Sequence, residues 1–203
     1  MDAVRVSALR ERLAGTGWPE AVGGFAGELR HAVSRRGAGE LLLVGTEAYE
    51  PWHLAAHLED EAAWSDVPRL APTLLRHRVP ARAPAHLAHG LQRLTGAGRG
   101  ATVLVVAPAA AGVPLLERVH DARRHGATVL AVDGAAADDP GEHADLAGLA
   151  HRRLAVGTAD EEPFDLAQHL VSAAAGQPAG RRGLGRLAAL AGQLTAGPAI
   201  SRW

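Results

Sequence analysis

Three short and almost wholly apolar runs, each followed by a segment with helical spacing of apolar residues, constrain the fold of this chain most. They are "LLLV" at 41–44, "ATVLVV" at 101–106 and "ATVLAVD" at 127–133. Strands with one face in water alternate apolar and polar residues, whereas strands covered on both faces are apolar throughout. The runs therefore predict a parallel sheet with helices packed on both of its faces.

Helical periodicity and one further strand fill the rest of the chain. The further strand, "HRRLAVG", is at 151–157, and the predicted helices are at 4–14, 19–35, 51–64, 113–125, 142–149 and 164–175. Strands that alternate with helices are typical of layered α/β domains. The predicted fold class is α/β, with a three-layer αβα doubly wound parallel sheet that follows N-terminal helices.

The segment between the first and second apolar runs is rich in proline. It holds Pro68, Pro72, Pro80 and Pro84. Proline donates no hydrogen bond to a sheet ladder, so at most a short edge strand fits here, and we place it at 73–77. A helix at 84–94 is expected to lead into the second apolar run.

The length of 203 residues fits one domain with an appendage. We place the domain at 1–176 and treat 177–203 as a separate Gly- and Arg-rich segment. Leu184, Leu187, Leu190 and Leu194 could line one face of a helix in that segment. It is therefore either a docked C-terminal helix or a loose basic tail.

Composition excludes several classes of chemistry. The chain has no Cys and no Lys, which rules out disulfides, thiolate metal sites and Schiff-base catalysis. It lacks an apolar run of about 18 residues, so no membrane span is expected. The N-terminus has no apolar signal region, which predicts a cytoplasmic protein. Aromatic residues make up only 3% of the chain, which argues against nucleic-acid binding by base stacking.

The charges are segregated along the chain. Residues 67–116 contain no Asp or Glu but carry arginines that include Arg76 and Arg78, and no acid follows Asp165. Acids instead follow the predicted strands, at Glu47, Glu50, Asp133, Asp138, Asp139, Asp160, Glu161, Glu162 and Asp165. Parallel strands end at one edge of the sheet, so this edge is predicted to be acidic, with arginines available from the acid-free segment.

The order and spacing of these elements resemble the SIS (sugar isomerase) family over residues 25–175. The resemblance is carried by "GELLLVG", by "ATVLVVAPAAAGVPLLERVHDARRHGATVLAVDG" and by "HADLAGLAHRRLAVG". Small bacterial SIS-like proteins of unknown function are the most similar. The resemblance implies a Rossmann-like fold, sugar-phosphate binding and association into homodimers.

SIS proteins that act on sugar phosphates carry two hydroxyl-bearing loops, one after the first strand and one after the strand that corresponds to 101–106. The first loop here is "GTEAYEPW", in which Gly45 matches and Thr46 is the hydroxyl near the phosphate position. The second, "APAAAGVP", has alanines such as Ala109 at the hydroxyl positions, and its Gly112 matches the motif glycine. By this resemblance, the two loops keep the backbone frame of a phosphate site but have lost most of its hydroxyl side chains.

The candidate ligand-binding residues lie at this carboxyl edge, and they are Gly45, Thr46, Glu47, Glu50, Ala109, Gly112 and Asp133. Carboxylates beside a phosphate dianion would repel it, by about 1 kcal/mol per charge pair at 4 Å in water and more when buried. Arginine could offset the repulsion. Alternatively, Glu47 and Glu50 only complement the N-terminus of the next helix, each by about 0.3–1 kcal/mol.

The helix predicted at 51–64 carries a second group of candidates. His53, His57 and Glu61 recur every four residues, a spacing that can bring metal ligands together. We expect a polar or interface face instead, with no metal and no cofactor. SIS-like domains commonly associate through helices beside this one, so Trp52, His53, His57 and Trp64 are the predicted homodimer interface.

The leading hypothesis is a divergent SIS-like domain that is non-catalytic and acts as a dimeric scaffold or as a sensor of a small ligand. The alternative is a sugar-phosphate isomerase or sugar-phosphate-binding protein that uses Thr46, backbone N–H groups and arginines. No catalytic residue is assigned from the sequence. Partners are expected to be a second copy of the chain and a small molecule, with no membrane and no nucleic acid.

Overall fold

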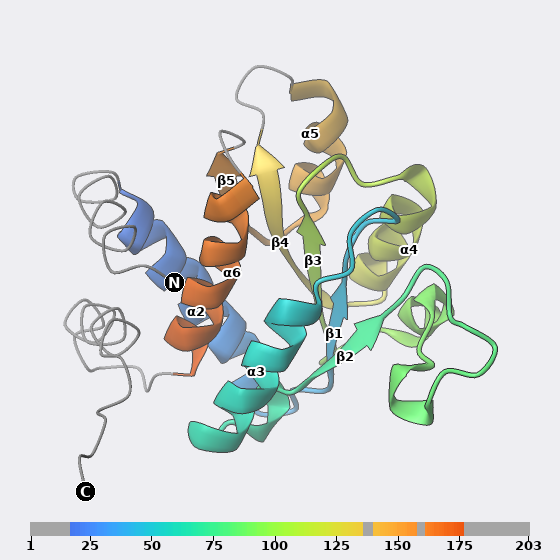
Figure 1. Ribbon diagram of the computed structural model, residues 1–203, viewed down its shortest axis with the longest axis horizontal. Coiled ribbons are helices and arrows are strands. Elements are labelled where there is room, and N and C mark those ends of the chain that lie inside the picture. Colours follow the sequence, from blue (N-terminus) through green and yellow to red (C-terminus); the bar gives the residue numbers. More distant parts are fainter. Residues whose placement is uncertain (1–16, 136–139, 158–160, 177–203) are drawn as a thin grey trace, which may run out of the picture.

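The computed structural model describes residues 17–135, 140–157 and 161–176 (Figure 1). The helix predicted at 4–14 and the segment 177–203 lie outside the described residues. Within them, no helix is long and apolar enough to cross a membrane.

The predicted alternation of strands and helices is confirmed. The described residues contain five strands, which are β1 (Leu41–Val44), β2 (Pro72–Leu75), β3 (Thr102–Ala107), β4 (Thr128–Ala135) and β5 (Arg152–Gly157). The α-helices are α2 (Trp18–Ser34), α3 (Trp52–Trp64), α4 (Val113–Arg124), α5 (Pro140–Leu149) and α6 (Glu161–Ala175).

All strands pair in parallel, in the order β2-β1-β3-β4-β5. The β2 strand lies at one edge of the sheet, as the prolines around it predict, because an edge strand has one side on which no ladder donor is needed. Successive side chains of β1 point to opposite faces of the sheet: Leu41 and Leu43 join one apolar cluster, and Leu42 and Val44 join the other.

Helices cover both faces of the sheet and make three layers. Helices α2, α3 and α6 pack against the first face, where Phe25, Leu58 and Val171 are buried. Helices α4 and α5 cover the second face, with Leu115 and Leu146 in its core (Figure 1). The three-layer doubly wound fold is therefore confirmed.

The prediction of a helix at 84–94 is wrong. Two short 3-10 helices, η2 (Ala85–Leu87) and η3 (Leu91–Gly96), replace it. Between them the backbone is extended at Gly90, which forms a parallel bridge with Arg76 beyond the end of β2. The N–H of Arg76 donates to the carbonyl of His89 at 2.9 Å. This pairing uses backbone groups that a continuous helix would have bonded internally.

Candidate functional site

The sheet order places a switch point between β1 and β3. The chain leaves β1 towards α3 on one face and leaves β3 towards α4 on the other face. The two loops therefore diverge above the carboxyl ends of adjacent strands, which is where open α/β sheets bind ligands. Six of the seven predicted ligand residues lie in these two loops, and the seventh, Asp133, lies in the neighbouring strand β4.

The loop after β1 is tightly folded and leaves little room at its start. Thr46 and Tyr49 form an antiparallel bridge, and the N–H of Tyr49 donates to the carbonyl of Thr46 at 3.2 Å. A side chain at Gly45 would collide with the backbone carbonyl of Tyr49. Thr46 is buried, at 4% exposure. The predicted phosphate hydroxyl is therefore largely withdrawn from solvent.

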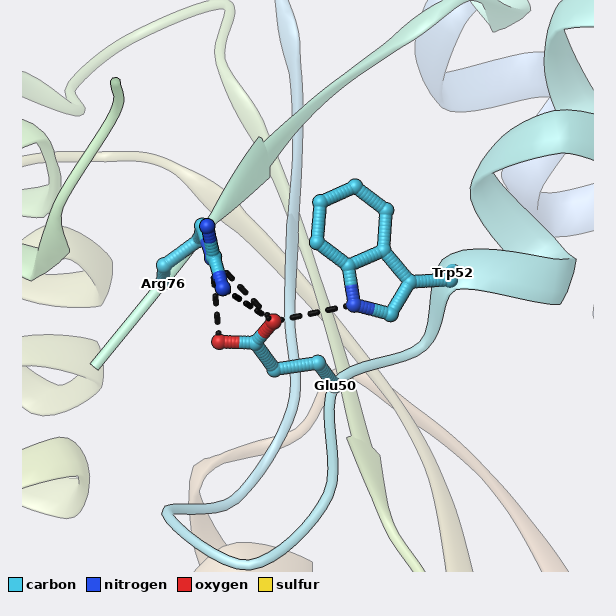
Figure 2. Close-up of polar contacts among 3 residues, drawn as sticks. All are labelled: Glu50, Trp52 and Arg76. Atoms are coloured by element: carbon cyan, nitrogen blue, oxygen red, sulfur yellow. Dashed lines mark hydrogen bonds and ion pairs between the residues drawn. The ribbon is translucent and has the colours of Figure 1, made fainter. Parts of the chain in front are cut away.

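Glu50, at the end of this loop, is held by two residues (Figure 2). Arg76 donates from Nε to both carboxylate oxygens at 3.1 Å, and its Nη2 lies 3.1 Å from Oε2. Trp52 Nε1 donates to the same Oε2 at 2.9 Å, and the guanidinium of Arg76 lies 5.2 Å from the centre of the Trp52 ring. The side chains of Glu50 and Arg76 are only 25% and 19% exposed. We call Glu50, Trp52 and Arg76 the loop clasp.

Two further contacts join the segment after β2 to the same loop. The Nε2 atom of His77 lies 3.0 Å from the carbonyl oxygen of Gly45. Arg78 donates to Glu47 at 2.8 Å, but both side chains are well exposed, so this ion pair stabilises the fold by at most about 1 kcal/mol. Two arginines of the acid-free segment thus neutralise Glu50 and Glu47, the two acids of the first loop.

Neither glutamate caps α3. The N-cap position of α3 is Pro51, which has no side-chain capping hydrogen bond, and the first turn of the helix holds no acid. The carboxylate of Glu50 bonds to Arg76 and Trp52 instead. The suggestion that these glutamates only complement a helix terminus is therefore wrong for Glu50, because the arginine is a full charge at hydrogen-bond distance.

The loop after β3 offers no side-chain hydroxyl to an anion, and the first turn of α4 has few N–H donors. Gly112 is the exposed N-cap of α4, and its carbonyl accepts hydrogen bonds from the N–H groups of Leu115 and Leu116, at 3.0 and 3.2 Å. Pro114 has no N–H. In the first turn of α4 only Val113 keeps an N–H that is free of these bonds. Ala109 is exposed but has no polar side-chain atom.

Asp133 is not exposed at the carboxyl edge. It lies inside β4 and is 0% exposed. Arg153 on β5 donates from Nε to its two oxygens, at 2.7 and 2.9 Å. Its predicted place among ligand residues is not supported by this geometry, because both of its oxygens already accept from a structural partner. Asp138, Asp139 and Asp160 lie outside the described residues, and no side-chain position is described for Glu161 or Glu162.

The four residues of the predicted interface are spread over most of the length of α3. Trp52 (39% exposed) and His53 lie at the start of α3, whereas Trp64 (78% exposed) is its last residue. Twelve residues separate the two tryptophans, which is about 18 Å along a helix. His57 instead packs against α6, with its Nε2 atom 3.0 Å from Nδ1 of His169.

The histidine stripe of α3 does not converge on a metal site. Within the described part of the chain, no three His, Asp or Glu side chains are grouped to hold a metal ion. His57 and His169 meet edge to face, with ring centres 4.4 Å apart. Burial, and next the neighbouring His57, lower the pKa of His169. The contact between His57 and His169 joins α3 to α6. His53, the first residue of the stripe, is exposed and lies outside this contact.

A polar cluster joins the first loop to α6. The side-chain amide of Gln168 donates to the hydroxyl of Tyr49 at 2.8 Å, and that hydroxyl lies 3.4 Å from Asp165. Burial is the main cause of the raised pKa of Tyr49. Sequence reasoning did not single out Tyr49, Arg76, His77 or Gln168 as site residues. For Arg76 and His77, the absence of acids from residues 67–116 was the sequence signal that could have pointed to a role beside the acidic loop.

The comparisons with known proteins show the fold. No protein-family model matches the sequence, and no characterised protein matches it significantly in sequence. Solved structures that share the fold include a "putative sugar binding protein" from Salmonella typhimurium LT2 and a "putative phosphosugar isomerase" from Silicibacter pomeroyi DSS-3. The first has a TM-score of 0.55 at 18% identity over 95% of this chain, and the second has 0.52 at 17% over 91%.

This chain spans about half the length of those two proteins, 52% of the first and 50% of the second. At such low identity the likeness concerns the fold and not the activity. The parallel sheet, its order and the two-sided helical cover agree with the sequence resemblance, and the chain has an SIS-like α/β fold.

Proposed function

We propose that this chain is a divergent, non-catalytic SIS-like domain that acts as a dimeric scaffold or as a sensor of a small ligand. The observation that supports this most directly is the loop clasp. An anionic ligand at the first loop would need the cation of Arg76. In the loop clasp, that cation is already paired with the chain's own Glu50. The buried Thr46 and the lack of a hydroxyl in the loop after β3 add to this view.

A thermal-shift panel tests the absence of sugar-phosphate binding. A ligand at 100 times its dissociation constant stabilises a fold by about 2.7 kcal/mol. We expect no saturable shift in melting temperature with hexose or pentose phosphates at millimolar concentration. A saturable shift with one of them would contradict the proposal and favour the alternative.

The proposed dimer uses the start of α3, where Trp52 and His53 are exposed. Aromatic side chains are enriched in protein interfaces because they bury a large area for few rotatable bonds. Light scattering after gel filtration should give a mass near twice 21.0 kDa at micromolar concentration. A substitution of His53 by Glu should shift the mass towards one chain, while the same substitution at exposed His86 should not. A wild-type mass of one chain would remove the dimer.

The alternative function is a sugar-phosphate-binding protein or isomerase. It is favoured by the two fold neighbours, which are described as a sugar binding protein and a phosphosugar isomerase, and by the two arginines beside the first loop, Arg76 and Arg78. On this reading a phosphate displaces a glutamate from its arginine. Any shift found in the panel should then disappear in Arg76→Met and persist in Arg69→Met, a change at an exposed residue of the same acid-free segment.

A further inference from the structure

The end of α3 carries an acidic and aromatic surface. Glu59, Asp60, Ala63 and Trp64 are exposed there, and Glu61 is partly buried; we call these five residues the α3 end surface. Trp64 is 78% exposed, although an indole ring is among the largest apolar groups in proteins. A segment that packed on this ring would remove a large apolar area from water, which would stabilise its docking.

The charges on this surface are poorly compensated. The C-terminus of a helix carries a partial negative charge and favours cations, yet the last turn of α3 holds no basic residue. Within the described residues, Glu59, Asp60 and Glu61 form no ion pair. Burial, and next the charge of Asp60, raise the pKa of Glu61. A cationic partner would therefore be stabilised by the carboxylates and by the helix dipole together.

The chain leaves α6 beside this surface. Gly176 follows the end of α6, and a side chain at this position would collide with the carboxylate of Glu61. Helix α6 lies next to α3, as the contact between His57 and His169 also shows (Figure 1). Trp64 is three residues beyond Glu61, or about 4.5 Å along the helix. Segment 177–203 therefore begins next to the α3 end surface.

The sequence of this segment complements the surface in charge and in apolar character. It has no Asp or Glu and carries Arg181, Arg182, Arg186 and Arg202. Its four leucines recur at intervals of three or four residues and could share one helical face. Arg181 lies five positions after Gly176, a span of about 17 Å when extended, so the arginines can reach the carboxylates.

We propose that segment 177–203 docks on the α3 end surface of its own chain, with its first arginines on Glu59, Asp60 and Glu61 and its leucine face on Trp64. The proposal does not depend on the proposed function. It gives the two ends of α3 different partners. The start of α3 stays available to a second copy of the chain, while segment 177–203 of the same chain covers the end.

Disulfide trapping in the full-length protein tests the contact, because the chain has no cysteine of its own. One variant combines Ala63→Cys on the α3 end surface with Ala188→Cys between two of the leucines. The matched control replaces Ala63→Cys by Ala56→Cys, which is exposed two turns earlier on the same face of α3. Docking raises the effective concentration of the first thiol pair, so its intramolecular disulfide should form at least about tenfold faster than that of the control.

Charge reversal tests the arginines. Arg181→Glu with Arg182→Glu should slow the trapping of the Ala63→Cys and Ala188→Cys pair, and Glu59→Arg with Asp60→Arg in the same chain should restore it. Equal trapping rates for the two cysteine pairs would overturn the proposal. Faster formation of disulfide-linked dimers by the Ala63→Cys single variant than by the Ala56→Cys single variant would also overturn it, since a second copy would then cover Trp64. Far-ultraviolet circular dichroism confirms that each variant is folded.

Discussion

The buried ion pair between Asp133 and Arg153 allows one prediction to be worked in detail. Asp133 is 0% exposed, whereas the side chain of Arg153 is 32% exposed and can reach water. At their 2.7 Å separation, an effective dielectric constant of about 20 gives a gross attraction of about 6 kcal/mol. Desolvation of the carboxylate offsets part of this attraction, and removal of one partner from a buried pair typically costs about 3–5 kcal/mol.

The two single substitutions should therefore differ. Arg153→Met leaves a carboxylate buried without a cation, and we expect the free energy of unfolding to fall by about 3–5 kcal/mol. Asp133→Asn leaves a partly exposed arginine and an amide that still accepts from Nε, so its cost should be about 1–2 kcal/mol. In the double variant no charge remains buried, so Asp133→Asn should stabilise the Arg153→Met background.

Urea denaturation of the four proteins at neutral pH measures these differences, with Arg152→Met on the same strand as a control at an exposed residue. A loss below about 1 kcal/mol for Arg153→Met would place the pair among weak surface pairs and refute the reasoning. So would a double variant that is less stable than Arg153→Met.

Two further predictions concern the first loop and the contact between α3 and α6. Gly45→Ala should lower the free energy of unfolding by about 1–3 kcal/mol in urea titrations, because the new methyl group meets the carbonyl of Tyr49; an unchanged midpoint would contradict the tight loop. The lowered pKa of His169 means that the unfolded chain binds a proton before the folded one does, so stability is full above pH 6.5 and falls as the pH drops through the folded pKa. The urea midpoint of His169→Gln should therefore decline less between pH 7.5 and 5.5 than that of the wild type, and equal declines would rule out this histidine as the cause.

Much of the fold could be predicted from local sequence. The apolar runs at 41–44, 101–106 and 127–133 became β1, β3 and β4, because a strand buried on both faces has to be apolar throughout. The prolines around 73–77 predicted an edge strand for the equally local reason that proline lacks a donor. The helix at 84–94 failed because Gly90 pairs with Arg76, a partner that local periodicity does not reveal.

The candidate site depended more on tertiary structure. The sequence determined that acids follow the strands and that arginines fill an acid-free segment, since both are properties of composition along the chain. Only the fold decided which charges meet, because the sheet order β2-β1-β3 brings Arg76 beside Glu50, and the pairing of β4 with β5 brings Arg153 beside Asp133. The attraction between two charges is strong only when they are a few ångströms apart. Glu50 and Arg76 are 26 positions apart in the chain, and Asp133 and Arg153 are 20 positions apart, so each pair forms only because parallel strands set its members side by side.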